Sequence, residues 1–127
     1  MKKEDNTNTM FYQNLGKLFY VIACVDGIIE VDEINTLKTM VEEEWSINED
    51  AFSILDSFNW LHMDQDYDSN TCFNSFLNFL NMNKSLFTEN RKTLILKTAN
   101  AIASSFSNRN KSELIILAKL DMELKKT

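Results

Sequence analysis

The chain has 127 residues, of which 44% are hydrophobic and 25% charged, and its formal net charge is −6. This balance is typical of a globular protein, and the length fits one domain with a substantial core. The acidic charge argues against nucleic acid or an anionic membrane surface as the main partner, because both select for Lys and Arg. It is compatible with binding to cations or to basic protein surfaces.

No stretch approaches the roughly 20 consecutive apolar residues that a membrane span needs, and the first lysines are not followed by the apolar run of a signal peptide. Membrane insertion is therefore not expected. Cys24 and Cys72 lie far apart, and neither belongs to a CxxC motif. We expect both to be reduced thiols in a cytoplasmic protein, with Cys24 buried. Residues 1–9 are expected to form a flexible N-terminus and residues 10–127 a single domain.

Proline is absent, and the only glycines are Gly16 and Gly27. So few helix breakers favour long helices. The period-2 alternation typical of strands is not sustained anywhere in the sequence. The sequence therefore predicts an all-α fold, a single-domain bundle of about six to seven helices.

The first predicted helix runs from about Met10 to Val25 and has one apolar stripe at spacings of three and four. Gly16 within it indicates the close approach of another helix. Gly27 ends the helix, since glycine accepts a positive φ cheaply. Glu30 is the expected N-cap of the second helix, and Glu33 completes a capping box. The apolar face of this second helix consists of Ile34, Leu37, Val41 and Trp45.

The middle of the chain has a weaker pattern. Asn48 is a candidate cap for a short helix that runs through Phe58, and residues 59–70 resemble a polar loop with some aromatic residues. A further helix is expected over Ser69–Met82. Trp60 lies outside the apolar stripes, which makes it a candidate anchor for a partner.

Two more helices are predicted at the end of the chain. Thr88 caps the first of them, whose stripe consists of Leu94, Ile95, Thr98, Ala99, Ile102 and Phe106. Residues 107–110 end this helix, and the last helix begins at Asn110 or Ser112. Its inward-facing residues are expected to be Leu114, Leu117, Ala118 and Leu120.

A shift of 80 residues overlays the first helix pair on the last one. Ile22 then aligns with Ile102, and Glu33 aligns with Glu113. Coincidence is the alternative to duplication, because amphipathic helices share period and composition. Duplication predicts a pseudo-twofold pair of helical hairpins, with the middle helices covering one side.

The turn between the first two helices contains a candidate metal site of four acids: Asp26, Glu30, Asp32 and Glu33. Asp26, Gly27 and Glu33 match the second half of a calcium-binding loop. The two earlier ligand positions hold Ile22 and Cys24, so a self-contained EF-hand is excluded. Water or another segment would have to complete the ligand set. Alternatively, the acids bind no cation and only stabilise the second helix, because negative charges near a helix N-terminus interact favourably with its dipole. The residues leave the cation site and this structural role both open.

Other candidate sites are weaker. His62 lies near Asp64, Asp66 and Asp68, but one histidine without a second His or Cys falls short of a zinc ligand set. The three aspartates alternate like the start of a calcium loop but lack the glycine and the closing glutamate. Cys72 has no apparent base partner for a nucleophilic role.

The first hairpin resembles the TerB-like, or tellurite-resistance-protein-B-like, family, whose relatives include N-terminal domains of some membrane-anchored DnaJ-type co-chaperones. The resemblance is carried by Ala23, Asp26, Gly27, Ile29, Asp32 and Glu33. It is clearest over residues 11–45 and fainter over 91–124, and residues 46–90 match nothing in the family. The second hairpin departs from the motif, because Phe106-Ser107 replaces the Asp-Gly pair.

The resemblance implies an all-helical domain with a pseudo-twofold core, acidic clusters with a proposed divalent-cation role, and no enzymatic activity. It also implies membership of a bacterial stress or tellurite-resistance system. The first hypothesis is therefore a TerB-like binding module that holds or senses a divalent cation, with calcium as the candidate. The alternative is an acidic protein–protein interaction scaffold or adaptor without metal. Its protein partner is unknown, and a monomer or a homodimer is expected. A small metal-dependent hydrolase would need convergent ligands and a pocket, which the sequence does not show.

Overall fold

The computed structural model describes residues 2–25, 29–45, 49–64, 68–105 and 111–126. These residues form six α-helices and three short helical segments, and no strand occurs among them. The predicted all-α bundle is therefore confirmed.

The six α-helices are α1 (Lys2–Cys24), α2 (Val31–Met40), α3 (Ser53–Asp64), α4 (Ser69–Met82), α5 (Glu89–Ser104) and α6 (Lys111–Lys125). Three short segments extend or precede them: the π-helix η1 (Val41–Trp45) and the 3₁₀ helices η2 (Glu49–Phe52) and η3 (Lys84–Leu86). The predicted bounds of α4 are confirmed, and Thr88 caps α5 as expected, its hydroxyl accepting the Arg91 N–H at 3.2 Å. None of the described helices combines the length and hydropathy needed to cross a membrane.

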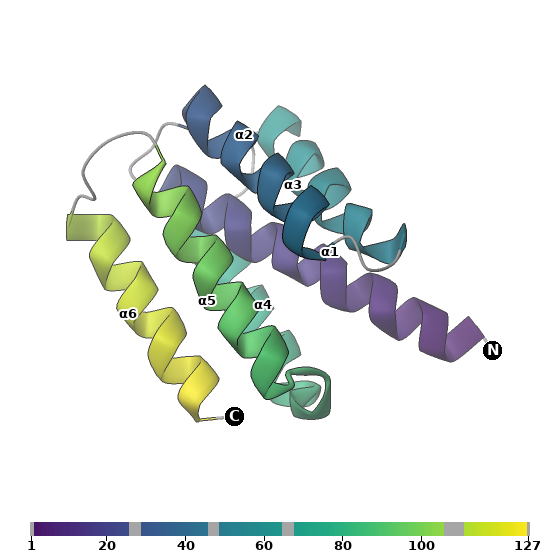
Figure 1. Cartoon of the computed structure of the whole chain (residues 1–127). Helices are drawn as coiled ribbons and strands as arrows, with labels where there is room; N and C mark the ends of the chain where they lie inside the picture. The colour runs from purple at the N-terminus through teal and green to yellow at the C-terminus, as the bar shows by residue number, and fades with distance from the viewer. Residues whose placement is uncertain (1, 26–28, 46–48, 65–67, 106–110, 127) are drawn as a thin grey trace.

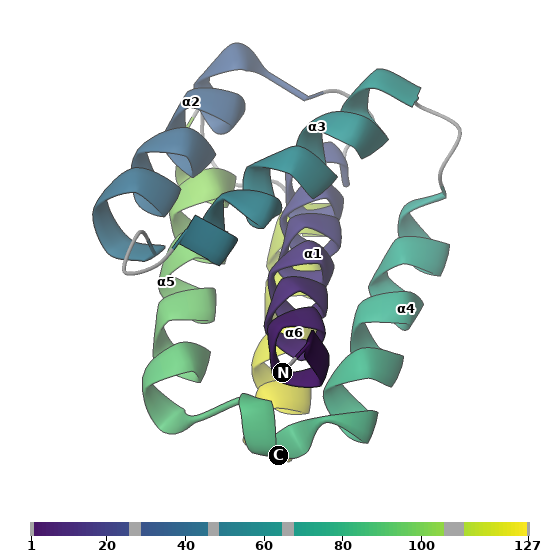
Figure 2. The same cartoon turned by 90° about the vertical axis from the view of Figure 1, so that its right-hand side faces the viewer.

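The central element is α1, which the other helices surround (Figure 2). It packs mainly against α3 and α4 and also contacts α5, α2 and α6. The predicted apolar stripe is confirmed over Phe11, Leu15, Leu18, Phe19 and Ile22, which are fully buried. The helix is buried on further sides as well, because residues outside this stripe are also buried: Tyr12, Tyr20, Val21 and Ala23. The helix begins at Lys2 rather than at Met10, and its first turns extend beyond the other helices (Figure 1). Residues 2–9 contain no proline or glycine that would stop it.

The helix pairs α1–α2 and α5–α6 form the two expected hairpins: in both, the end of the first helix and the start of the second lie at the same end of the molecule (Figure 1). The second helix of each hairpin packs against the first helix of the other, α2 on α5 and α6 on α1. Positions related by the shift of 80 share their burial: Ile22 and Ile102 are fully buried, and Glu33 and Glu113 are 4% and 5% exposed. The packing therefore follows the predicted hairpin arrangement, while its origin in duplication stays a prediction.

The middle of the chain differs from the prediction. Residues 59–64 are helical, so the expected polar loop is wrong over this stretch. The physical reason is that Ile54, Phe58 and Leu61 form one buried stripe that continues across it. The expected cap, Asn48, lies outside the described residues, and α3 is instead preceded directly by η2.

The inward face of α6 also differs from the prediction. Leu117 and Leu120 are buried as expected, but Leu114 is 50% exposed and Ala118 is exposed too. The buried face is rotated and consists of Glu113, Ile116, Leu117, Leu120 and Leu124. Because α6 packs mainly against α5, with less contact to α1, only one narrow stripe is covered (Figure 1).

Candidate functional site

α1 and α3 approach each other closely at Gly16. A β-carbon on this glycine would lie 2.6 Å from the Ile54 carbonyl oxygen and 2.6 Å from Cβ of Ser57. The Ser57 hydroxyl donates a hydrogen bond to the Gln13 carbonyl oxygen at 2.9 Å. Gly16 therefore permits the close helix approach that the sequence predicted.

A cleft of about 350 Å³ lies beside this crossing, between α1 and α3. Its lining residues are Gln13 and Lys17 from α1 with Ser53, Asp56, Ser57, Trp60 and Leu61 from α3. The Lys17 ammonium donates a hydrogen bond to the Ser75 hydroxyl of α4 at 3.2 Å. This bond holds the Lys17 side chain against α4.

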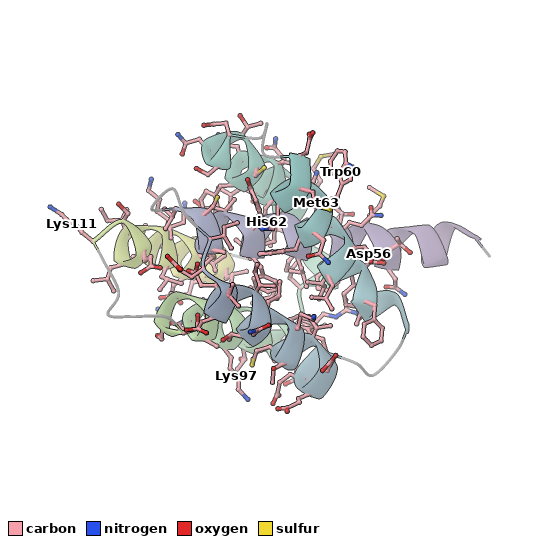
Figure 3. All side chains as sticks on the ribbon, turned by 90° about the horizontal axis from the view of Figure 1, so that it is seen from above. Asp56, Trp60, His62, Met63, Lys97 and Lys111 are labelled. Atoms are coloured by element: carbon pink, nitrogen blue, oxygen red, sulfur yellow. The ribbon has the colours of Figure 1, made fainter. Side chains whose placement is uncertain are left out.

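The outward face of α3 bears large apolar side chains beside the cleft. Trp60 is 60% exposed, and Phe52 and Met63 are exposed as well. Figure 3 shows Asp56, Trp60 and Met63 along α3. Asp56 precedes Trp60 by four residues, so both side chains lie on one face of the helix. No described residue forms an ion pair with Asp56.

Charge is segregated along the chain. The segment 39–83, which contains η1, α3 and α4, has no lysine or arginine. Its nine acids are Glu42, Glu43, Glu44, Glu49, Asp50, Asp56, Asp64, Asp66 and Asp68. All thirteen basic residues therefore lie elsewhere, as Lys97 and Lys111 do in Figure 3.

The predicted acidic site at the first hairpin is only partly within the described residues. Asp26 lies outside them. Glu30 and Glu33 come together at the start of α2, where the Glu33 carboxylate accepts the Glu30 N–H at 2.8 Å and the Glu30 side chain accepts the Glu33 N–H. This confirms the capping box. Asp32 is exposed on the first turn. The cation site itself stays a prediction.

The weaker candidates do not come together in the part of the chain that the structure describes. Among these residues, no group of three or more His, Cys, Asp or Glu side chains is placed to hold a metal ion. His62 is half-buried, with its ring centre 6.4 Å from that of Phe58. The Asp68 carboxylate accepts the Thr71 N–H at 3.0 Å as the cap of α4, and Asp66 lies outside the described residues.

The two thiols lie in different environments. Cys24, the last residue of α1, is half-buried rather than buried as predicted, and it packs against the edge of the core. Cys72 is buried, and burial raises the pKa of its thiol despite the opposing effect of Lys17. Burial, followed by the nearby Cys24, raises the pKa of Tyr20 to about 12. A raised thiol pKa disfavours a nucleophilic role for Cys72.

Sequence reasoning identified Trp60 but missed Asp56 and the cleft. The available signal was the spacing of four between Asp56 and Trp60, which places them on one helix face once residues 59–64 are known to be helical. Comparisons with protein-family models, curated proteins and solved structures find no match for the chain.

Proposed function

We propose that this chain is a non-enzymatic binding module that engages another protein through the outward face of α3 and the adjoining cleft. The observation that carries the proposal is Trp60, whose indole is 60% exposed beside a cleft. Tryptophan is enriched among the residues that dominate binding energy at protein interfaces. It supplies a large apolar surface for a partner.

The extent of the surface favours a protein partner over a small molecule. Exposed apolar side chains lie near the end of α3, at Trp60 and Met63, and at Phe52 in the preceding η2 segment. Small-molecule sites instead enclose most of the ligand surface. A partner that lies along α3 would cover the apolar side chains and place one of its own in the cleft.

A display selection with random peptides tests this proposal. Peptides enriched on the wild-type protein should lose binding to Trp60→Ala, and Met82→Ala should retain it. Met82 is a suitable control because it is equally apolar and highly exposed, but lies at the end of α4. Selection of no peptide, or of peptides that bind Trp60→Ala equally well, would contradict the proposal.

The TerB-like resemblance supports the same class of function, since it implies a binding domain without enzymatic activity. Membership of a bacterial stress or tellurite-resistance system and a cytoplasmic location also belong to the proposal. The first of these depends on the motif over residues 23–33, and the second on the expectation that Cys24 and Cys72 are reduced and form no disulfide.

Divalent-cation binding at the first hairpin is the second candidate function, with Asp26, Glu30, Asp32 and Glu33 as ligands. The observation that favours it is the capping box, which brings the Glu30 and Glu33 carboxylates to the same turn. A calcium titration tests it. Saturation at 100 times the dissociation constant would raise the free energy of unfolding by about 2.7 kcal/mol.

Two variants sharpen the calcium experiment. Glu33→Gln should abolish the effect, because the amide retains an acceptor for the capping box but loses the negative charge. Glu113→Gln is the matched control, since it changes the equally buried glutamate of the second hairpin. An unchanged response in Glu33→Gln would eliminate this candidate.

A further inference from the structure

We infer that the cleft between α1 and α3 recognises a cationic side chain, above all an arginine, on an amphipathic segment of the partner protein. The inference rests on the proposed function and names the chemistry of its partner. The side chain would lie between the Trp60 indole and the Asp56 carboxylate.

The first argument is local geometry. Asp56 and Trp60 are one helical turn apart, and both line the cleft. A guanidinium stacks on an indole face and donates two parallel hydrogen bonds to a carboxylate. The chain already holds one guanidinium by a related combination: the central carbon of the Arg91 guanidinium lies 4.3 Å from the Phe11 ring centre, and its Nη1 donates to the Leu86 carbonyl oxygen at 2.8 Å.

The second argument is charge. The segment 39–83, which includes α3, has nine acids and no lysine or arginine. The ammonium group of Lys17 is tied to Ser75 of α4, and no described residue forms an ion pair with Asp56. Lys17 keeps its positive charge on the α1 side of the cleft, whereas the α3 side carries the Asp56 carboxylate, so the α3 side favours a basic partner over an acidic one.

The third argument is the choice of arginine over lysine and over a free cation. The hydroxyls of Ser53 and Ser57 and the amide oxygen of Gln13 add acceptors along the cleft. The arginine guanidinium has five N–H donors in one plane, so it can hydrogen-bond to several of these acceptors at once. The lysine ammonium is compact and reaches fewer of them. Met63 is exposed on the same helix as Trp60, so a ligand with apolar residues next to its cation would cover more apolar surface than a free polyamine or amino acid does.

Three synthetic peptides of matched length test the inference in solution. The first is an amphipathic peptide of leucine, alanine and arginine at helical spacing, and the other two have glutamine or glutamate in place of each arginine. We expect the arginine peptide to bind most tightly and the glutamate peptide not to bind. Binding should weaken as salt is added. Affinity is measured by calorimetry at low and at physiological ionic strength.

Two variants locate the site, and two controls accompany them. Trp60→Ala should weaken the binding of the arginine peptide about thirtyfold, as expected for an interface hot spot. Asp56→Asn should weaken this binding about two- to fivefold, which corresponds to the contribution of an exposed ion pair. Met82→Ala and Glu89→Gln should leave it unchanged, since they remove an apolar side chain and a charge elsewhere. Circular dichroism checks that each variant is folded.

Several results would overturn the inference. Equal affinity for the glutamine and arginine peptides would refute the cationic specificity, and it would leave the proposed function intact if Trp60→Ala still lost binding. Equal losses in Glu89→Gln and Asp56→Asn would reveal unspecific charge attraction. Arginine amide binding as tightly as the peptide would refute a protein partner. Trp60-dependent self-association in sedimentation experiments would make a second copy of the chain the occupant instead.

Discussion

Gly16 on α1 and Ser57 on α3 approach so closely that a β-carbon on the glycine would lie 2.6 Å from that of the serine. The same serine lines the cleft, and its hydroxyl binds the backbone of α1. Asp56 and Trp60 belong to the same helix, so this contact sets how far both lie from α1. The candidate site thus depends on a backbone approach in the core.

Replacement of Gly16 by alanine should destabilise the protein by about 1–3 kcal/mol, as expected for overpacking of a close contact. In an unobstructed helix the same change would gain up to about 1 kcal/mol through helix propensity, so the sign of the effect is informative. Urea unfolding followed by circular dichroism measures it.

A double-mutant cycle identifies the cause of this loss. Ser57→Gly removes the nearest β-carbon, so Gly16→Ala should cost less in that background. The rescue should be partial, because the Ile54 carbonyl oxygen remains 2.6 Å from the added methyl group. If the single variant Gly16→Ala were more stable than the wild type, this result would contradict the close approach of the two helices.

The fold was largely predictable because apolar periodicity and helix caps are local signals. Ile95, Thr98 and Ile102 fall on one stripe, and all are fully buried. The Thr88 hydroxyl accepts a hydrogen bond from the backbone N–H of Arg91, only three residues further along the chain. Neither effect requires knowledge of the neighbouring helices.

The errors arose where burial depends on tertiary neighbours. Leu114 and Ile116 both look like core residues, but α6 covers only one narrow face, and Leu114 lies outside it. The candidate cleft was unpredictable for the same reason, since its residues come from two helices about 40 positions apart in sequence. Trp60 was noticed because it lies off the buried stripe of its own segment.

Thr98 connects η1 to α5 and should be sensitive to loss of its hydroxyl. It is fully buried, accepts the Trp45 indole N–H at 3.0 Å and donates to the Leu94 carbonyl oxygen at 2.8 Å. Thr98→Val keeps the shape but leaves the indole N–H buried without its acceptor, which should cost about 1–3 kcal/mol. Thr98→Ser retains the hydroxyl and should cost less in urea unfolding. Equal stability of the valine variant and the wild type would show that this bond contributes little.

Tyr20 should make the protein less stable in alkali. Its pKa is raised to about 12 from an ordinary value of 10.0, mainly by burial. The folded state therefore holds the phenolic proton more tightly than the unfolded state does. The stabilisation is complete below pH 10 and is lost as the pH rises towards 12. Comparison of the wild type with Tyr20→Phe in urea at pH 9 and pH 11 isolates this contribution, which should be absent from the phenylalanine variant.

The two thiols should differ in their rates of alkylation. Cys24 is half-buried, whereas Cys72 is buried and its thiol has a raised pKa. Iodoacetamide reacts with thiolates, so Cys24 should be modified first at neutral pH, and Cys72 should react at a comparable rate only after unfolding. Mass spectrometry of tryptic peptides follows both. Preferential modification of Cys72 in the native protein would contradict its burial.

Glu33 should contribute to stability through the cap of α2, whether or not a cation binds nearby. Its carboxylate accepts the Glu30 N–H at 2.8 Å, and its side chain is 4% exposed. Glu33→Ala removes the acceptor and should cost about 0.5–2 kcal/mol, the range for loss of a helix cap. Glu33→Gln keeps an acceptor in the capping box, so in metal-free buffer it should be closer in stability to the wild type. If both variants lost the same stability without metal, the charge of Glu33 rather than its hydrogen bond would hold the first turn of α2, because the glutamine retains the acceptor and lacks only the charge.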